Sequence, residues 1–282
     1  MCELMALSFE SPISADFSIR EFAARGDENP DGWGLGWYPD QSLAIVKEPV
    51  KWGASHYAGF LSSYARIESR IHIAHVRHKT VGDEPSHADT HPFSREVGGR
   101  DYCFAHNGTL EGPIWDLPLG DHRPMGRTDS EQFFCHLLGR IKAWGPLDTR
   151  AAWERLYEFL AEANRMGKLN VLLSDGRRLF CYHDLGGWKG LNFRKVRIGA
   201  DEIRHFGDET LSLDLDTDAT NRGFVVATCP LSAVGWHTFH RGELIVFEQG
   251  AIRYSSHRGH DSHEFGPASA VAGLGSSPAG AR

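Results

Sequence analysis

Several features that define other classes of protein are scarce or missing in this 282-residue chain. No apolar run approaches the roughly 18 residues that a membrane-spanning helix needs, so no membrane span is expected. The five cysteines are odd in number, scattered and without CxxC spacing, which argues against a disulfide framework or structural zinc and for a reducing compartment such as the cytoplasm. The net charge of −7 argues against a nucleic-acid partner.

The ends of the chain differ in character from its middle. The N-terminus lacks the basic region and long apolar stretch of a secretory signal peptide. From Gly266 to Arg282 the sequence is almost wholly glycine, alanine, serine and proline, which cannot bury enough apolar surface to become ordered. We therefore expect one folded domain over residues 1–255 and a disordered tail over residues 256–282.

The predicted strands and helices occur in blocks. Apolar runs and alternation predict strands at residues 2–9, 34–38, 44–47, 70–76, 102–105, 169–174, 179–183, 224–228, 243–248 and 252–254. Helical spacing predicts helices at Ser14–Ala24, Ser55–Tyr64, Asp129–Lys142 and Thr149–Met166. The acidic stretch from Asp208 to Asp218 is expected to be a solvated loop. This order favours an α+β fold with helices packed on antiparallel sheet, not alternating βαβ units.

Cys2 is a candidate nucleophile because of its place in the chain. Met1 precedes a small residue and is of the kind that methionine aminopeptidase removes, which would leave a thiol and an α-amine on one residue. The α-amine has a pKa of about 7.7–8.0 and the thiol one of about 8.5, so the amine can accept the thiol proton. The alternative is a buried cysteine that merely follows Met1.

Two other segments could complete an acyl-transfer site. In His106-Asn107-Gly108, the Asn107 amide and the Gly108 N–H could both point at one anion, although an ordinary Asn-Gly turn fits as well. Arg77, which follows a predicted strand, could hold a carboxylate through its planar guanidinium, or could belong to a surface basic cluster.

The segment Thr128–Glu131 opens a predicted helix. Thr128 and Glu131 have the spacing of a capping box. Asp129 then occupies the first helical position, where it either complements the helix dipole or accepts the ammonium group of an amino-acid substrate.

Histidines are frequent between His72 and His106, but they do not form a metal-binding motif. No HExxH is present, and in a strand His72 and His75 would point to opposite faces. We therefore predict no metal site, and the sequence gives no sign of an organic cofactor.

Taken in order, these motifs resemble one family. The chain is similar to the class II glutamine amidotransferases, which are N-terminal-nucleophile hydrolases, and most of all to their stand-alone YafJ-type branch, over about residues 2–255. The motifs that carry the resemblance are Cys2, Arg25-Gly26, Asp31-Gly32-Trp33-Gly34, Arg77 with Thr80, Thr90-His91-Pro92-Phe93, His106-Asn107-Gly108 and Thr128-Asp129-Ser130-Glu131.

The resemblance implies a four-layer αββα sandwich of two antiparallel sheets flanked by helices, with Cys2 at the end of a central strand. Cys2 would attack the γ-carboxamide of glutamine with its α-amine as base. The resemblance gives the other residues these roles: Asn107 and Gly108 as the oxyanion hole, Arg77 for the substrate carboxylate, Asp129 for its amine, Thr80 for positioning, and Arg25, Gly26, His91 and His106 for the shape of the site.

The sequence also departs from the synthase-fused members of the family. His78 and Val81 stand where those members have Trp and His, which bears on how the site closes over glutamine. With residues 2–255 assigned to one domain, no part of the chain is left to use the ammonia. Three hypotheses follow: a hydrolase of glutamine or a γ-glutamyl amide, as in ergothioneine biosynthesis; a glutaminase subunit with a separate synthase partner; and a non-catalytic γ-glutamyl-binding protein, which retention of Met1 would favour. The oligomeric state stays open.

Overall fold

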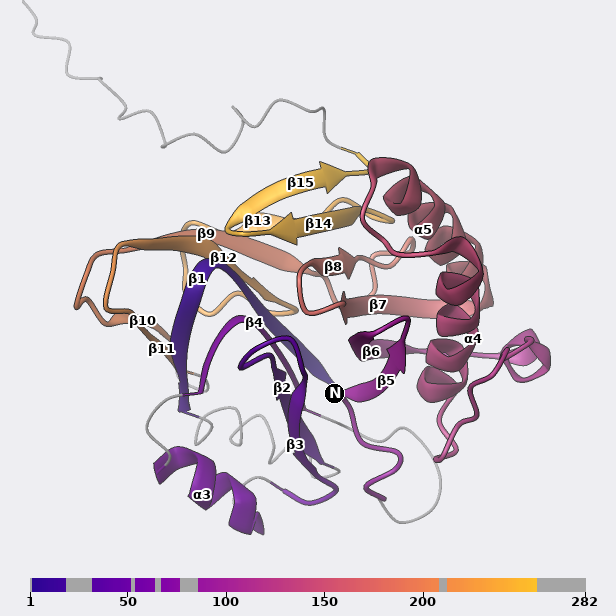
Figure 1. The fold of residues 1–282 in the computed structure, drawn as a ribbon, viewed down its shortest axis with the longest axis horizontal. Helices are drawn as coiled ribbons and strands as arrows, with labels where there is room; N and C mark the ends of the chain where they lie inside the picture. The colour runs from indigo at the N-terminus through magenta and orange to yellow at the C-terminus, as the bar shows by residue number, and fades with distance from the viewer. Residues whose placement is uncertain are drawn as a thin grey trace, which may run out of the picture.

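Two antiparallel β-sheets lie face to face at the centre of the protein (Figure 1). The computed structural model describes residues 2–18, 32–51, 54–63, 67–76, 86–207 and 212–257. Among these residues, no helix is long and apolar enough to cross a membrane. All five cysteines are described, and none of them forms a disulfide bond.

The first sheet contains the N-terminal strand at its centre. Its main path runs β13-β9-β12-β1-β4-β2-β3, and β11 extends it by pairing with both β1 and β10. The strands described in it are β1 Glu3–Ser18, β2 Trp33–Trp37, β3 Ala44–Glu48, β4 Glu68–Val76, β9 Asn192–Ile198, β10 Arg204–Gly207, β11 Ser212–Asp216, β12 Asn221–Ala227 and β13 His237–Thr238.

The second sheet has the order β15-β14-β8-β7-β6-β5. Its strands are β5 Phe93–Val97, β6 Arg100–Leu110, β7 Gly167–Ser174, β8 Leu179–Tyr182, β14 Leu244–Glu248 and β15 Ala251–Ser255. The described helices are α3 His56–Ser63, α4 Asp129–Trp144 and α5 Arg150–Ala163, together with the short 3₁₀ turns η2 Gly112–Asp116 and η3 Asn164–Met166.

Three hydrophobic clusters hold these layers together. Leu4, Ala6 and Cys103 belong to the cluster between the two sheets. A second cluster joins the second sheet to α4 and α5, where Phe104 stacks on Phe134 with ring centroids 4.9 Å apart. Each fully buried side chain of this size contributes about 1.5–3 kcal/mol to folding. The third cluster lies on the outer face of the first sheet, against α3.

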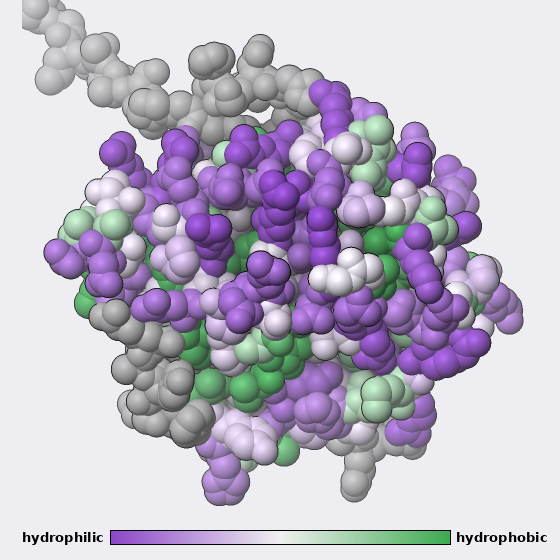
Figure 2. All heavy atoms as spheres, in the orientation of Figure 1, coloured by the Kyte–Doolittle hydropathy of each residue, from purple (hydrophilic) through white to green (hydrophobic). Residues whose placement is uncertain are grey.

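The layered arrangement confirms the predicted fold class. Helices α4 and α5 cover the outer face of the second sheet, and α3 lies beside the first sheet (Figure 1). The order from outside to outside is therefore helix, sheet, sheet, helix. Figure 2 shows that most of the visible surface is polar, with apolar residues in a few separate patches.

Two secondary-structure predictions were wrong in part. The predicted helix Ser14–Ala24 begins as strand, because β1 continues to Ser18 and pairs with β11, Ser14 opposite Asp216. The acidic stretch Asp208–Asp218 is not all loop, because β11 buries Leu213 and Leu215 while Asp214 and Asp216 alternate to the other face. Residues 258–282 lie outside the described residues, so the domain boundary and the disordered tail stay predictions.

Candidate active site

Cys2 lies at the entry to β1, on the side of the first sheet that faces the second. Leu4 and Ala6 pack in the cluster between the sheets, so alternation along the strand directs the Cys2 side chain to the same face. The residue is partly exposed. Its thiol is therefore within reach both of the second sheet and of solvent.

The position of Cys2 is fixed by hydrogen bonds at the neighbouring residues. The Thr228 N–H donates to the Leu4 carbonyl at 3.1 Å, and the Leu4 N–H donates to the Thr228 hydroxyl oxygen at 3.2 Å. The same hydroxyl donates to the Glu3 carboxylate. Together these bonds hold the beginning of β1 against the end of β12.

Asn107 connects the second sheet to Cys2. It lies on β6, is 4% exposed, and donates from Nδ2 to the Cys2 carbonyl oxygen at 2.8 Å. Cys103 and Ala105, at the same parity along β6, pack between the sheets, so Asn107 faces the same layer. An amide donor is thus held within hydrogen-bonding distance of the main chain of the candidate nucleophile.

His106 faces the opposite side of β6. Its Nδ1 lies 2.8 Å from the Ser130 hydroxyl on α4, and its Nε2 lies 3.0 Å from the Lys168 carbonyl oxygen on β7. Burial lowers the pKa of His106, a shift that the nearby Asp129 carboxylate opposes. The ring is therefore neutral near pH 7. Because a carbonyl only accepts, we assign the ring proton to Nε2, with Nδ1 accepting from Ser130. His106 thus ties β6 to its neighbours from behind the site.

Gly108 has no room for a side chain. Its φ is +157°, and a Cβ atom would lie 1.9 Å from the Lys168 carbonyl oxygen and 2.7 Å from His106 Nε2. Glycine is therefore required by the close approach of β6 and β7, whatever part its N–H takes in chemistry.

Replacing Gly108 with alanine should destabilise the fold by about 2–4 kcal/mol, because the backbone of β7 must move to admit the methyl group. Urea denaturation measures the change. Gly99→Ala is the matched control: its φ is +78°, but a Cβ atom there meets nothing within 4 Å. It should cost only about 1 kcal/mol. Equal losses for the two variants would contradict the steric account.

Asp129 begins α4 and touches the end of β6. Its Oδ2 accepts from the Leu110 N–H at 2.6 Å, and its Oδ1 lies 3.4 Å from the Ser130 hydroxyl. The predicted capping box is only half formed. Thr128 accepts from the Glu131 N–H at 3.2 Å as predicted. The buried Glu131 carboxylate instead accepts from Arg95 at 2.6 Å and from the Gly126 N–H at 2.7 Å.

His91 packs beside the site in contact with a histidine that the sequence analysis did not select. Its ring centroid lies 4.4 Å from that of His75, which pairs with Leu4 across β4 and β1. Gly34 opposes His75 on β2, and a Cβ atom there would lie 2.2 Å from the His91 carbonyl oxygen. The Asp-Gly-Trp-Gly motif therefore allows β2 to approach the segment that carries His91.

Lys47 holds that same segment and was also missed. Its Nζ donates to the carbonyl oxygens of Thr90 at 2.6 Å and Pro92 at 3.3 Å. Burial lowers the pKa of Lys47 to about 8. A lysine in an edge strand carries no sequence signal for this role, since its acceptors are main-chain atoms distant in the chain.

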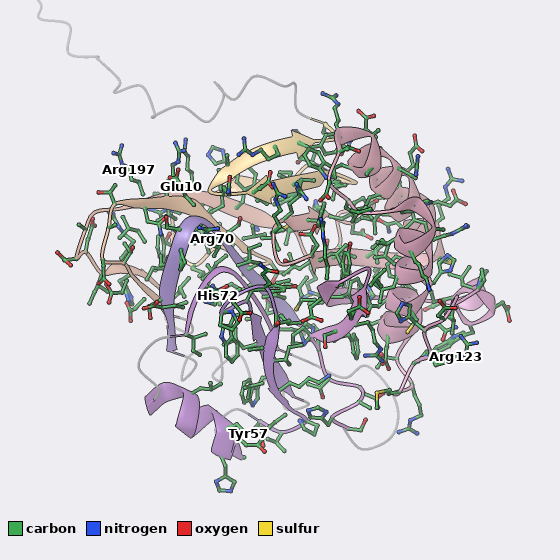
Figure 3. All side chains as sticks on the ribbon, in the orientation of Figure 1. Glu10, Tyr57, Arg70, His72, Arg123 and Arg197 are labelled. Carbon is green, nitrogen blue, oxygen red and sulfur yellow. The ribbon has the colours of Figure 1, made fainter. Side chains whose placement is uncertain are left out.

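His72 lies on β4 (Figure 3), and alternation along the strand places it with Ala74 on the outer face and His75 with Ile73 on the face between the sheets, as predicted. Its Nε2 is 3.0 Å from the Ile67 carbonyl oxygen, and burial lowers the pKa of His72 to about 4. Its side chain therefore lies in the outer cluster of the first sheet, away from Cys2.

Four predicted site residues cannot be placed. Arg25, Gly26, Arg77 and Thr80 lie outside the described residues, as does Met1. The strand that leads into Arg77 ends at Val76, opposite Glu3.

A cysteine at the end of a central strand, between two antiparallel sheets that are flanked by helices, is the arrangement of the N-terminal-nucleophile hydrolase amidotransferases. The family model for class II glutamine amidotransferases matches residues 1–268, and the chain belongs to that family.

Individual proteins agree with this assignment. The chain is 37% identical over 260 residues to an uncharacterized protein of Methanocaldococcus jannaschii, covering 92% of this chain and 72% of that protein. It is 32% identical over 257 residues to Escherichia coli YafJ, which is provisionally named a glutamine amidotransferase, covering 88% and 97% of the two chains.

Two further matches bear on structure and chemistry. The structure of a predicted glutamine amidotransferase from Pseudomonas aeruginosa aligns with a TM-score of 0.71 at 27% identity, covering 90% of this chain and all of that one. The γ-glutamyl-hercynylcysteine sulfoxide hydrolase of Mycolicibacterium smegmatis is 28% identical over 167 residues, covering 57% and 66%.

Proposed function

We propose that this protein is an amidohydrolase in which Cys2 hydrolyses glutamine or another γ-glutamyl amide. The observation that carries the proposal is the 2.8 Å hydrogen bond from Asn107 Nδ2 to the Cys2 carbonyl, since it brings an amide donor to the residue that bears the thiol. Family membership supports the reaction class. Release of glutamate from glutamine by the purified protein, followed with glutamate dehydrogenase, tests the proposal.

The proposed reaction needs Cys2 to carry an α-amine, and so needs Met1 to be removed. The amine takes the thiol proton, and the sulfur attacks the γ-carbonyl carbon. The Asn107 side chain and the Gly108 N–H stabilise the resulting oxyanion. The proton returns to the amide nitrogen, the C–N bond breaks, and ammonia or an amine leaves. Water then attacks the thioester, which gives glutamate and restores the thiol.

The glutamyl end of the substrate carries one carboxylate and one ammonium group. In the proposed site Arg77 pairs with the carboxylate, Thr80 helps to position it, and Asp129 accepts from the ammonium. Oδ1 of Asp129 is suited to this role, because Oδ2 already accepts the Leu110 N–H. Arg25, Gly26, His91 and His106 shape the surroundings. Such a pair of opposite charges selects a free amino-acid end over the interior of a peptide.

Replacing Asp129 with asparagine should raise the KM for glutamine about 10- to 100-fold, which corresponds to the loss of one charge-assisted hydrogen bond. Steady-state kinetics measure this change. Asp121→Asn is the control, since Asp121 is an exposed carboxylate that pairs with Lys142 and should leave KM unchanged. If KM and kcat/KM are unaltered in Asp129→Asn, the residue only begins the helix.

Two alternative functions predict different experimental results. A glutaminase subunit would feed ammonia to a synthase partner, and its glutamate release should rise when that partner is added. A non-catalytic binding protein would bind glutamate without turning over any amide. The name of the Mycolicibacterium smegmatis relative, which specifies a γ-glutamyl conjugate, supports hydrolysis over both alternatives.

A further inference from the structure

The segment that connects β8 to β9 crosses from the second sheet to the first beside Asn107 and Thr228. It runs from Asp184 to Leu191, and we call it the crossover segment. At the second sheet, Asn170 donates from Nδ2 to the Trp188 carbonyl at 2.7 Å and accepts from the Asp184 N–H at 2.9 Å. Asn170 is fully buried and lies directly opposite Asn107 in the β6–β7 register.

The crossover segment also reaches the residues that hold the beginning of β1. A Cβ atom on Gly190 would lie 3.8 Å from the Thr228 carbonyl oxygen, which accepts from Asn192 Nδ2 at 2.9 Å just beyond the segment. Thr228 in turn bonds to Leu4. The crossover segment therefore borders the candidate active site from both sheets.

Two lysines lie close to the Trp188 ring on this segment. Lys168 Nζ is 3.9 Å from the indole centroid, and Lys189 Nζ is 5.8 Å from it. Lys168 pairs with Thr109, two residues along β7 from Asn170, so it shares the face of the sheet that carries Asn107 and Asn170. We call Lys168, Trp188 and Lys189 the Trp188 cluster.

The Trp188 cluster has unused capacity to bind an anion. Its indole Nε1 is buried and donates to no acceptor within the described part of the chain. Neither lysine forms an ion pair with another described residue. Because the indole nitrogen has almost no exposed surface, the two lysines are the groups that a ligand can reach.

The nearby carboxylate of Asp184 is bonded to groups other than the two lysines. Asp184 accepts from the N–H groups of Trp188 and Leu169, both at 2.9 Å, and from the Asn164 side chain at 2.8 Å. Burial alone would raise the pKa of Asp184, but these hydrogen bonds hold it below its ordinary value. Its oxygens are thus committed to the crossover segment and its neighbours, and the two ammonium groups are left for a ligand.

From this juxtaposition we infer that the Trp188 cluster binds a carboxylate on the part of the substrate that leaves. The inference rests on the proposed function of Cys2. Asp129 would hold the glutamyl end from the α4 side of β6, whereas the cluster borders Asn107 from the β7 side. The group that departs from the γ-carbonyl is then an amine that bears a carboxylate, such as an amino acid or a short peptide, and the preferred substrate is a γ-glutamyl amino acid and not glutamine.

Two matched amides test this assignment. γ-Glutamylglycine and γ-glutamylethylamide present the same scissile bond and differ by a carboxylate in place of a methyl group. The wild-type kcat/KM should be about 10-fold or more higher for γ-glutamylglycine, the effect of roughly one charge-assisted hydrogen bond. In Lys168→Met, which keeps the length of the side chain, the ratio should fall towards one through loss of activity on γ-glutamylglycine only. Lys142→Met, on the exposed face of α4, should keep the wild-type ratio.

Equal kcat/KM values for the two amides in the wild type, or an unchanged ratio in Lys168→Met, would overturn the inference while leaving the proposed hydrolysis intact. If neither amide is hydrolysed, calorimetry on Cys2→Ala protein decides the inference separately, and the proposed function fails only if glutamine is not hydrolysed either. Tighter binding of γ-glutamylglycine than of the ethylamide, lost on adding Lys168→Met, would support the carboxylate site. Equal binding, or binding of neither, would refute it.

Discussion

Replacing Cys2 with serine should lower the rate of glutamine hydrolysis by about 10⁴-fold or more, while glutamate still binds. Loss of an enzymatic nucleophile has an effect of this order, because the thiol is the group that forms the acyl intermediate. A serine hydroxyl is a much weaker acid than a thiol, so the α-amine cannot activate it equally well near neutral pH. Glutamate binding, measured by calorimetry, should persist because the residues proposed to hold its amino-acid end are untouched.

Cys229→Ser is the matched control for this experiment. Cys229 is the other partly exposed cysteine and follows Thr228, which bonds to Leu4, so it reports on any general effect of removing a thiol near the beginning of β1. It should retain full activity. A Cys2→Ser protein that hydrolyses glutamine at the wild-type rate would refute the assignment of the nucleophile.

Replacing Asn107 with alanine should lower kcat/KM by about 10²- to 10³-fold, the usual effect of removing one oxyanion donor. It should also destabilise the fold by about 1 kcal/mol, because the hydrogen bond to the Cys2 carbonyl is lost. The kinetic effect is the larger because the donor acts on charge that develops only in the transition state.

Asn221→Ala separates the two effects of the Asn107 change. Asn221 is equally buried, and its side chain bonds to Ser11 from β12 through a 3.0 Å donor contact and a 3.2 Å acceptor contact. Its removal should cost at least as much stability without changing kcat/KM. If Asn107→Ala also keeps kcat/KM within about threefold, then Asn107 only joins the two sheets.

The sequence predicted the elements in which apolar residues recur at helical spacing or in which a turn motif joins two strands. Helix α4 and the β7–β8 hairpin followed from helical spacing and from Asp175-Gly176, where Gly176 adopts a φ of +80° and Asp175 accepts from the N–H groups of two following residues. Strands β9 and β10 carry charged residues on their exposed faces and were missed for that reason. The strand at Ser14 was mistaken for helix because its partner, β11, lies about 200 residues away in the chain.

Only those residues of the candidate site that stand in a sequence motif could be predicted. Cys2, Asn107 and Asp129 stand in recognisable segments, and the contact between Cys2 and Asn107 agrees with their being grouped. Thr228 and Asn170 have no such signal. Thr228 acts through a bond to Leu4 across the first sheet, and Asn170 through the main chain of the crossover segment. Residues whose hydrogen-bond partners are main-chain atoms distant in the sequence can be identified only from the folded structure.

The most direct test of the account is the intact mass of the purified protein before and after treatment with 6-diazo-5-oxo-norleucine, an electrophile that mimics the γ-glutamyl group. We predict a mass that lacks Met1 and gains a single adduct, which peptide mapping should place on Cys2. Retention of Met1, or a processed chain that gains no adduct, would contradict the proposal that Cys2 is the N-terminal nucleophile of a γ-glutamyl amide hydrolase.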